Sequence, residues 1–298
     1  MKHLKHPKLL IVRKFLFMSL FLGSAIWLPA WNTFSVTAKH DDEQIIPTTQ
    51  HRQRVESVIG WSKIHVFYGN TSGLGVALNQ QQWFSQVGQD RIVMELIGPN
   101  GYFIDLASND AVNLSNTFAL ERYGWTGLCI EPNPIYWYGL SHRNCTVVGA
   151  FVGGSTEKVQ VQFRGPYGGI IGENITKRTF RRKKQKREPV PALPLYERYT
   201  ISLKEVLRKF HVPKVIDYLS LDVEGAEWLI MQDFPFDEYR MKVMSVERPP
   251  KHLRELLRSK RYILVKKLGF FGETLWAHES MKLTPEHPNL VVKAQTRT

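Results

Sequence analysis

From residue 102 onward, short apolar runs alternate with helix-like stretches, and this alternation limits the possible folds more than any other feature of the sequence. Strands are predicted at 102–106, 127–130, 146–151, 216–221, 241–246, 262–268 and 274–277. Helices are predicted at 114–123, 134–142, 202–210, 226–231 and 250–260. Ser202 and Glu205 form a capping-box pattern at the start of one helix. Strands that alternate with helices predict an α/β protein with a doubly wound, mostly parallel sheet.

Four of the predicted strands end in a carboxylate: Asp105, Glu131, Asp222 and Glu247. Ligands of open α/β sheets bind outside the carboxyl ends of the strands, so these acids indicate a binding site. Glu131 follows Asp105 by 26 residues, close to the spacing at which a second-strand acid accepts hydrogen bonds from a ribose. The loop after Asp105 has Ala and Ser where dinucleotide folds place glycines. A nucleoside cofactor without a pyrophosphate, such as S-adenosylmethionine, is therefore favoured over a dinucleotide.

The chain resembles the FkbM-type methyltransferases in four stretches: SQVGQDRIV (85–93), FIDLASNDAVNLSNTFALE (103–121), CIEPNP (129–134) and DYLSLDVEGAEW (217–228). The resemblance covers about two thirds of the chain, and its most specific part is the Asp-Val-Glu-Gly-Ala-Glu run that begins at Asp222. It implies an S-adenosylmethionine-dependent O-methyltransferase with a seven-stranded, Rossmann-like sheet of the class I type.

The resemblance also implies roles for individual residues. Asp105 and Asn109 would lie by the methionine part of the cofactor, and Glu131 would hold its ribose. The full set of implied cofactor residues is Asp105, Ala107, Asn109, Asp110, Asn116, Glu131 and Asp222. The family usually has glycine at the positions of Ala107 and Ala111, where alanine adds a methyl group and resists a positive φ. This departure bears on cofactor affinity more than on the fold.

Asp222 and Glu224 are the candidate catalytic residues. Methyl transfer to an alcohol is aided by a nearby base, which contributes about 10²–10⁴-fold. Because side chains alternate along an extended chain, the two carboxylates would point the same way. Asp222 is interpreted as the base or as a cation ligand, with Glu224 as its partner. No histidine accompanies them at tight spacing, and no metal site is assigned.

The N-terminal segment predicts a membrane anchor. Residues 1–14 hold five basic and no acidic side chains, and the following 17 residues are apolar and span about 25 Å as a helix. The basic flank would stay in the cytosol and send the body into the endoplasmic reticulum or Golgi lumen. A cleaved signal peptide, which would make the protein secreted, and a buried core helix are the alternatives. The predicted regions are a basic tail (1–14), an anchor (15–31), a linker (32–82), a methyltransferase-like domain (83–280) and a tail (281–298).

Three further features bear on the compartment. Cys129 and Cys145 would pair in an oxidising lumen, or would be two small buried residues on neighbouring strands. Glycosylation sequons begin at Asn70, Asn113, Asn144 and Asn174, and the resemblance places the one at Asn113 in a buried helix start. The basic loop at 176–188 is interpreted as a solvated loop, with an anionic-acceptor contact or a dibasic processing site as alternatives.

The formal charge of +13 does not indicate nucleic-acid binding. Thirteen basic residues lie in two runs, 1–14 and 177–187, and the rest of the chain holds 27 basic and 27 acidic side chains. The leading hypothesis is an O-methyltransferase of a glycan, lipid or small-molecule hydroxyl in the secretory pathway. The alternatives are a non-catalytic, membrane-tethered trafficking adaptor with this fold and a type II glycosyltransferase that uses Asp222 and Glu224 as a metal motif.

Overall fold

The computed structural model describes residues 53–58, 62–68, 82–164, 167–171 and 194–290. The chain divides into two compact units, Met1–Gln44 and Ile45–Thr298, and the description that follows concerns the second. The predicted basic tail, the anchor at 15–31, the basic loop at 176–188 and the sequons at Asn70 and Asn174 lie outside the described residues. No helix within the described ranges has the length and apolar character needed to cross a membrane.

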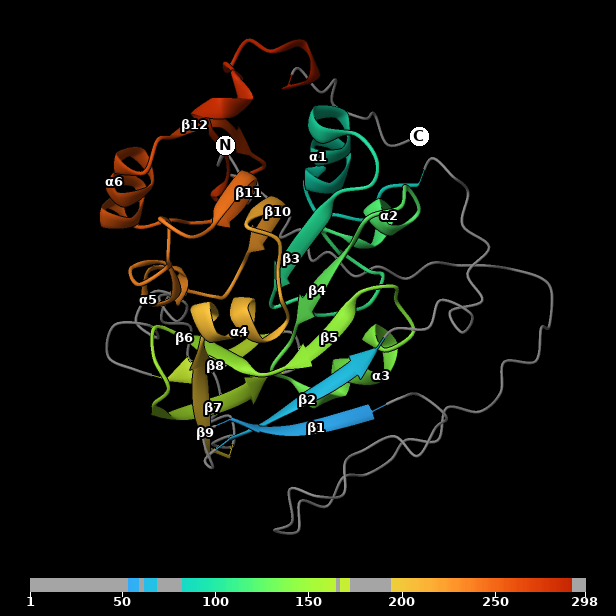
Figure 1. Ribbon diagram of the computed structural model, residues 1–298, viewed down its shortest axis with the longest axis vertical. Coiled ribbons are helices and arrows are strands. Elements are labelled where there is room, and N and C mark those ends of the chain that lie inside the picture. The colour runs from blue at the N-terminus through green and yellow to red at the C-terminus, as the bar shows by residue number, and fades with distance from the viewer. Residues whose placement is uncertain (1–52, 59–61, 69–81, 165–166, 172–193, 291–298) are drawn as a thin grey trace, which may run out of the picture. The chain divides into compact units, whose positions relative to one another are not determined.

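A nine-stranded sheet forms the centre of the domain, in the order β1-β2-β5-β4-β3-β10-β11-β13-β12 (Figure 1). Its strands are β1 (Gln53–Val58), β2 (Ser62–Tyr68), β3 (Tyr102–Leu106), β4 (Thr126–Ile130), β5 (Thr146–Gly149), β10 (Val215–Leu221), β11 (Arg240–Glu247), β12 (Tyr262–Leu268) and β13 (Glu273–His278). The five central strands, from β5 to β11, pair in parallel. The strands outside them pair antiparallel.

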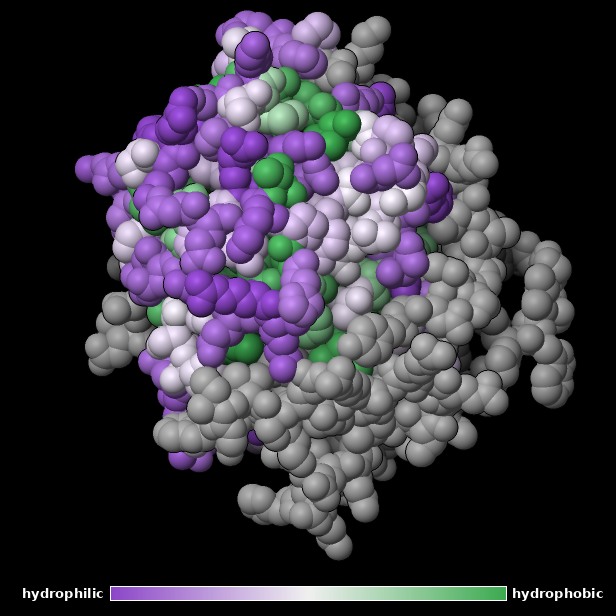
Figure 2. Space-filling model, in the orientation of Figure 1, coloured by the Kyte–Doolittle hydropathy of each residue, from purple (hydrophilic) through white to green (hydrophobic). Residues whose placement is uncertain are grey.

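Each face of this sheet packs against three helices, which confirms the doubly wound arrangement, although the sequence did not predict α1 (Gln89–Ile97). Helices α4 (Leu203–Lys209), α5 (Glu227–Met231) and α6 (Lys251–Ser259) cover one face. Helices α1 (Gln89–Ile97), α2 (Phe118–Glu121) and α3 (Trp137–Leu140) cover the other (Figure 1). Alternation within β3 supplies both cores, because Ile104 faces the first set of helices and Phe103 faces the second. The described surface in Figure 2 is mostly hydrophilic, since most large apolar side chains lie in these two cores.

A second, four-stranded sheet lies between β5 and α4 in the sequence. Its order is β6-β9-β7-β8, with β6 (Phe151–Gly153), β7 (Lys158–Arg164), β8 (Tyr167–Ile171) and β9 (Tyr196–Ser202). The predicted strand at 146–151 is in fact divided: β5 stays in the main sheet, and after Ala150 the chain enters the small one. Three short 3-10 turns, η2 (Pro134–Tyr136), η3 (Glu279–Met281) and η4 (Pro288–Leu290), complete the described elements.

The structure corrects several boundaries. The α/β prediction is confirmed, but the main sheet has nine strands instead of seven, and only its central five are parallel. The extra strands, β1 and β2, come from residues 53–68, which the sequence predicted as an unstructured linker; they extend the sheet by pairing β2 with β5. The predicted C-terminal tail also contributes to the domain, because Leu283 and Leu290 are buried in the core.

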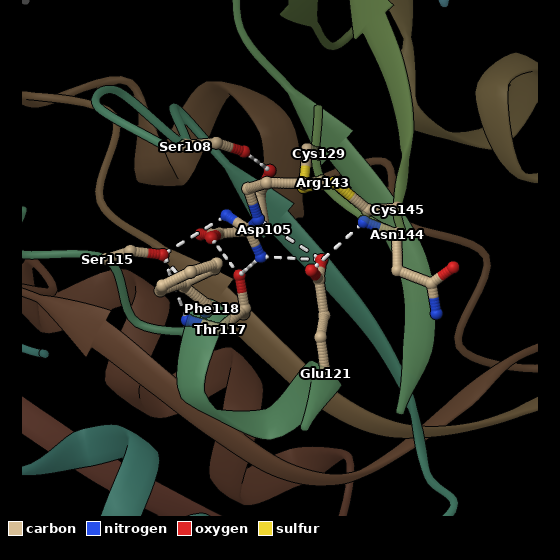
Figure 3. The surroundings of a disulfide bond; sticks show 10 residues. All are labelled: Asp105, Ser108, Ser115, Thr117, Phe118, Glu121, Cys129, Arg143, Asn144 and Cys145. Carbon is tan, nitrogen blue, oxygen red and sulfur yellow. Dashed lines mark hydrogen bonds and ion pairs between the residues drawn. A yellow bond between two sulfur atoms is a disulfide. The ribbon is translucent and has the colours of Figure 1, made fainter. Parts of the chain in front are cut away.

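The disulfide between Cys129 and Cys145 joins β4 to the residue before β5 (Figure 3). Of the two alternatives for these cysteines, the pairing is the one that the structure contains. Both cysteines are fully buried, and Cys129 is the register partner of Asp105 on β3. The bond therefore fixes the segment that carries Arg143 and Asn144 against the middle of the sheet.

Arg143 is fully buried and forms the centre of a polar network (Figure 3). Its Nη2 lies 2.9 Å from Glu121 Oε1 and 2.8 Å from Thr117 Oγ1, and its Nη1 donates to Ser115 Oγ over 3.2 Å. Thr117 Oγ1 in turn donates to Asp105 Oδ2 over 2.6 Å. Burial raises the pKa of Asp105, and the positive charge of Arg143 opposes that shift. The network connects β3, α2 and the disulfide, and it shortens the predicted helix at 114–123 to Phe118–Glu121 by holding Ser115 and Thr117 in a loop.

Replacing Arg143 with methionine tests the energetic weight of this network. We expect R143M to lower the free energy of unfolding by about 3–5 kcal/mol, because Asp105 and Glu121 would remain buried without their cation. Urea denaturation gives the value. The control is R208M, which removes an exposed pair with Glu238 of similar length, 2.7 Å, and should cost at most about 1 kcal/mol. Equal losses in the two variants would contradict the account.

Candidate active site

The carboxyl ends of the parallel strands meet in one straight row. Four residues are register partners across neighbouring strands: Ile130 on β4, Leu106 on β3, Leu221 on β10 and Val246 on β11. The next residue of each chain segment is therefore Glu131, Ala107, Asp222 or Glu247. Three of the four acids that the sequence placed at strand ends, Glu131, Asp222 and Glu247, lie in this second row along one edge of the sheet. Ala107 lies between Glu131 and Asp222.

Asp105 lies outside that row. It is one residue before the end of β3, 2% exposed, and its side chain belongs to the Arg143 network on the α2 side of the sheet. Its neighbours in the same sheet row are Cys129 and Ser220. The structure therefore places Asp105 two residues below the row of the other predicted residues, where its side chain supports the site from the core shared with α2.

The loop after β3 turns sharply on residues that have left-handed backbones. Ala107 has φ 60° and Asn109 has φ 55°, a region that disfavours residues with a Cβ. The backbone N–H groups of Ala107 and Ser108 both donate to the carbonyl oxygen of Ile130, at 2.9 and 3.2 Å. Ala107 thus adopts a left-handed conformation that glycine takes most readily. Ala111 has no positive φ, and its methyl group packs in the core near Gly139.

Glu131 is bound to that loop. Its Oε2 accepts the N–H of Asn109 over 2.8 Å, and its Oε1 accepts the N–H of Asn133 over 2.7 Å. Burial raises the pKa of Glu131 to about 7, although both hydrogen bonds oppose the shift by favouring the carboxylate. The sequence predicted Glu131 and Asn109 in one site, and the structure brings them into direct contact.

Asn116 and Asp110 have different surroundings from each other. Asn116 Nδ2 donates to Ser220 Oγ on β10 over 2.9 Å, while its Oδ1 is buried with no hydrogen-bond partner. Asp110 Oδ1 accepts the N–H groups of Val112 and Asn113, so it stabilises the loop.

Asn113 itself is exposed, which corrects the prediction that this sequon is buried, although Ser115 of the same sequon is buried.

Asp222, Glu224 and Glu247 form an acidic cluster at the ends of β10 and β11. One carboxylate oxygen of each residue lies within 4.8 Å of those of the other two. Asp222 and Glu224 lie close together as expected, but the expectation that an extended chain would point them the same way is wrong. The chain is not extended there: Glu224 has φ 53° and Gly225 has φ 106°, so a tight turn folds the second carboxylate back beside the first. The helix that follows, α5, begins at Glu227.

Two further acids surround this cluster, and the sequence analysis did not select them. Glu273 is 5% exposed and pairs in register with Glu247, and Glu227 is 3% exposed. Antiparallel pairing explains Glu273, because the first residue of β13 must lie at the edge where β11 ends. Gln89, at the start of α1, also reaches Glu273 by a side-chain hydrogen bond. The sequence feature that could have identified Glu273 is its position immediately before the last predicted strand, 274–277.

The acids raise one another's pKa. Burial raises the pKa of Asp222 well above its usual range, and the negative charge of Glu247 adds to the effect. Burial followed by the charge of Glu247 also raises the pKa of Glu273 to about 7. Arg248 is the basic side chain that contacts the cluster, at 3.4 Å from Glu224 and closely paired with Glu247.

Exposed apolar side chains lie on the loops at this same edge. Phe270 is fully exposed and Phe271 is 56% exposed in the hairpin between β12 and β13, whose register places it beyond Glu247 and Glu273. The loops that follow β3 and β4 add Leu114 and Ile135, each 65% exposed. The rim of the candidate site therefore has apolar surface, whereas its floor is acidic.

Comparison with known proteins assigns the chain to a class of enzyme domain. The family model of the Methyltransferase FkbM domain matches residues 105–264, which is more than half of the chain. The chain belongs to this methyltransferase family, as the sequence motifs indicated. Among curated proteins none matches the chain, and no solved structure matches it. The match begins at Asp105, two residues before the row position of Ala107, and includes Glu131, Asp222, Glu224 and Glu247.

Replacing Ala107 with glycine tests the strain in the loop. We expect A107G to raise the free energy of unfolding by about 1 kcal/mol, because glycine takes the left-handed conformation at no steric cost. Thermal and urea denaturation measure the change. A111G is the control: Ala111 has no positive φ, so the loss of its buried methyl group should destabilise the protein. A destabilised A107G protein would contradict the description of the loop.

Proposed function

We propose that the protein is an S-adenosylmethionine-dependent O-methyltransferase whose site is the edge formed by the ends of β3, β4, β10 and β11. The observation that carries the proposal is the row in which the Ala107 loop, Glu131 and Asp222 follow directly after paired residues. Membership of the FkbM methyltransferase family supports the same reaction class.

The residues present fit the cofactor. Glu131 is held by backbone N–H groups on both oxygens, which keeps a carboxylate in a fixed position to accept ribose hydroxyls. The loop keeps its left-handed turn at Ala107, so the alanine does not change the backbone path. Asn116 Oδ1 is a buried acceptor without a partner, and an amino group of the methionine part would satisfy it.

The acidic cluster supplies the groups that act on the acceptor. When bound, the cofactor would provide a methyl group on a positively charged sulfur. Asp222 has a raised pKa, so it is a stronger base than an ordinary aspartate and is suited to take a proton from the acceptor hydroxyl. Glu224 lies beside it in the tight turn and would hold the hydroxyl in place. Orientation of the reacting groups contributes up to about 7–11 kcal/mol in well-ordered sites.

Alanine at positions 107 and 111 is the observation that favours the second candidate, a non-catalytic adaptor that retains the methyltransferase fold. An adaptor needs no buried carboxylates at the strand ends, and it would tolerate their neutralisation. The buried acids at this edge oppose this candidate, because the raised pKa values of Glu131, Asp222, Glu224 and Glu273 are costly for a domain that only binds other proteins. Cofactor binding decides between the two.

We place the domain in the lumen of the secretory pathway, attached by the apolar segment at 15–31. The disulfide between Cys129 and Cys145 supports an oxidising compartment, and Asn144 is an exposed sequon residue beside it. Protection of the domain from protease in sealed microsomes, lost on adding detergent, tests this placement. A domain that is digested without detergent would exclude it.

The acceptor that the rim favours has a hydroxyl and an apolar portion, such as a lipid-linked sugar. Phe270, Phe271, Leu114 and Ile135 would contact the apolar portion, while the acidic floor receives the hydroxyl. These four exposed side chains lie on loops that follow the strand ends, and exposed apolar surface of this kind marks a site for an apolar ligand portion.

Calorimetric titration of the full chain with S-adenosylhomocysteine tests the cofactor site. We expect micromolar binding at pH 8, at least tenfold weaker binding in E131A, and unchanged binding in E255A, which removes an exposed acid on α6. Because the ribose hydroxyls need the ionised carboxylate and the pKa of Glu131 is about 7, affinity should fall about tenfold from pH 8 to pH 6. Absence of binding by folded wild-type protein would reject the enzyme and leave the adaptor.

A further inference from the structure

The acidic cluster contains more negative charge than its surroundings neutralise. Asp222, Glu224 and Glu247 place one oxygen each within 4.8 Å of the others, and Glu227 and Glu273 lie next to them. Within the described residues, Arg248 is the basic side chain whose charge acts on the cluster. Five carboxylates, of which Glu227, Glu247 and Glu273 are buried, thus face a single guanidinium group.

Two buried oxygens of the cluster, Asp222 Oδ1 and Glu247 Oε2, accept no hydrogen bond from an N–H group or a hydroxyl. Asp222 and Glu247 can hydrogen-bond to each other only when one of the two carboxyls carries a proton. Glu247 is 8% exposed, and the oxygen that it pairs with Arg248 is Oε1. Buried polar atoms are normally satisfied, because leaving one unpaired costs free energy. These two atoms therefore indicate a ligand that the protein itself does not provide.

The chemistry of the donors identifies the kind of ligand. All three side chains offer carboxylate oxygens, and neither histidine nor cysteine belongs to the group. Oxygen donors of this type select hard divalent cations such as Mg²⁺, Mn²⁺ and Ca²⁺. Arg248 binds the outer side of the cluster through Glu224 and Glu247 and leaves the free oxygens of Asp222 and Glu247 unoccupied by it.

We propose that Asp222, Glu224 and Glu247 bind one divalent cation at the carboxyl ends of β10 and β11. Binding of the cation does not depend on the proposed function, whereas its role in the reaction does. A cation there would bind the acceptor oxygen and lower the pKa of the hydroxyl. Asp222 then acts as a ligand, which is the other role that its sequence context predicted. The competing explanation is a single proton shared between Asp222 and Glu247, which would also relieve their repulsion.

Manganese titration of the full chain decides between the cation and the shared proton. The protein is first treated with a chelator and then titrated with MnCl₂, and free Mn²⁺ is followed by electron paramagnetic resonance without cofactor or acceptor. We expect one Mn²⁺ per chain, displaced by MgCl₂. E247Q and D222N should bind at least tenfold more weakly, whereas D237N, at an exposed aspartate, should bind as the wild type does.

The variants are chosen so that folding does not obscure the result. E247Q and D222N keep the shapes of their side chains and remove repulsion, so we expect them to fold. E224Q, at a side chain that is 29% exposed, gives a third test if either buried variant does not. Mn²⁺ should also raise the melting temperature of the wild type and leave that of E247Q unchanged.

Two results would overturn the proposal: no stoichiometric Mn²⁺ bound by the folded wild type, or equal binding by wild type and all three variants. Either result would leave the shared proton as the explanation of the cluster. The measurement is independent of the cofactor, so a failure here is distinct from a failure of the S-adenosylhomocysteine titration.

Discussion

The buried guanidinium of Arg143 is the interaction on which the geometry of the site depends. It has no exposure to solvent and connects Asp105 on β3, through Thr117, to Glu121 on α2 and Ser115 in the loop between them. Removing it from this position would leave two buried carboxylates without a cation. The disulfide holds the segment that carries Arg143 to β4, so the path of the loop after β3 is determined on both sides.

Above that support, the site is divided into two electrostatically different parts. Around Glu131 each carboxylate oxygen accepts a backbone N–H, so the negative charge is stabilised and the group is held still. Around Asp222 and Glu247 there are unpartnered oxygens and neighbouring acids instead. A neutral hydroxylated ligand suits the first part, and a cation suits the second. The two parts lie on either side of the loop after β3, because β3 pairs with β4 on one side and with β10 on the other.

The strands and helices with strong periodicity could be predicted from the sequence. The capping box at Ser202 is formed as expected, and β10 and β11 differ from their predicted ranges by only one residue at each altered end. The edge strands β1 and β2 were missed because a polar stretch such as Gln53–Val58 gains its order from pairing, here through β2 with β5. The small sheet was missed for the same reason, since it is completed by β9, which pairs with β6 and β7 from more than 30 residues further along the chain.

The candidate site was predicted in part. A strand followed by an acid identified Glu131, Asp222 and Glu247, because a parallel sheet brings such ends together. The same rule misplaced Asp105, because it lies two residues before the row, inside β3, where Thr117 and the Arg143 network cover its side chain. Glu273 and Arg143 could not be found from local pattern, because antiparallel pairing and a contact over more than 20 residues decide their positions.

A crystal structure of the full chain with S-adenosylhomocysteine tests the central claim most directly. The account predicts the ribose hydroxyls on the carboxylate of Glu131, the homocysteine part next to Asn116, and the sulfur directed towards the Asp222 cluster. Ligand density elsewhere on the domain, with Glu131 still bound only by its own loop, would contradict the assignment of this edge of the sheet as the methyltransferase site.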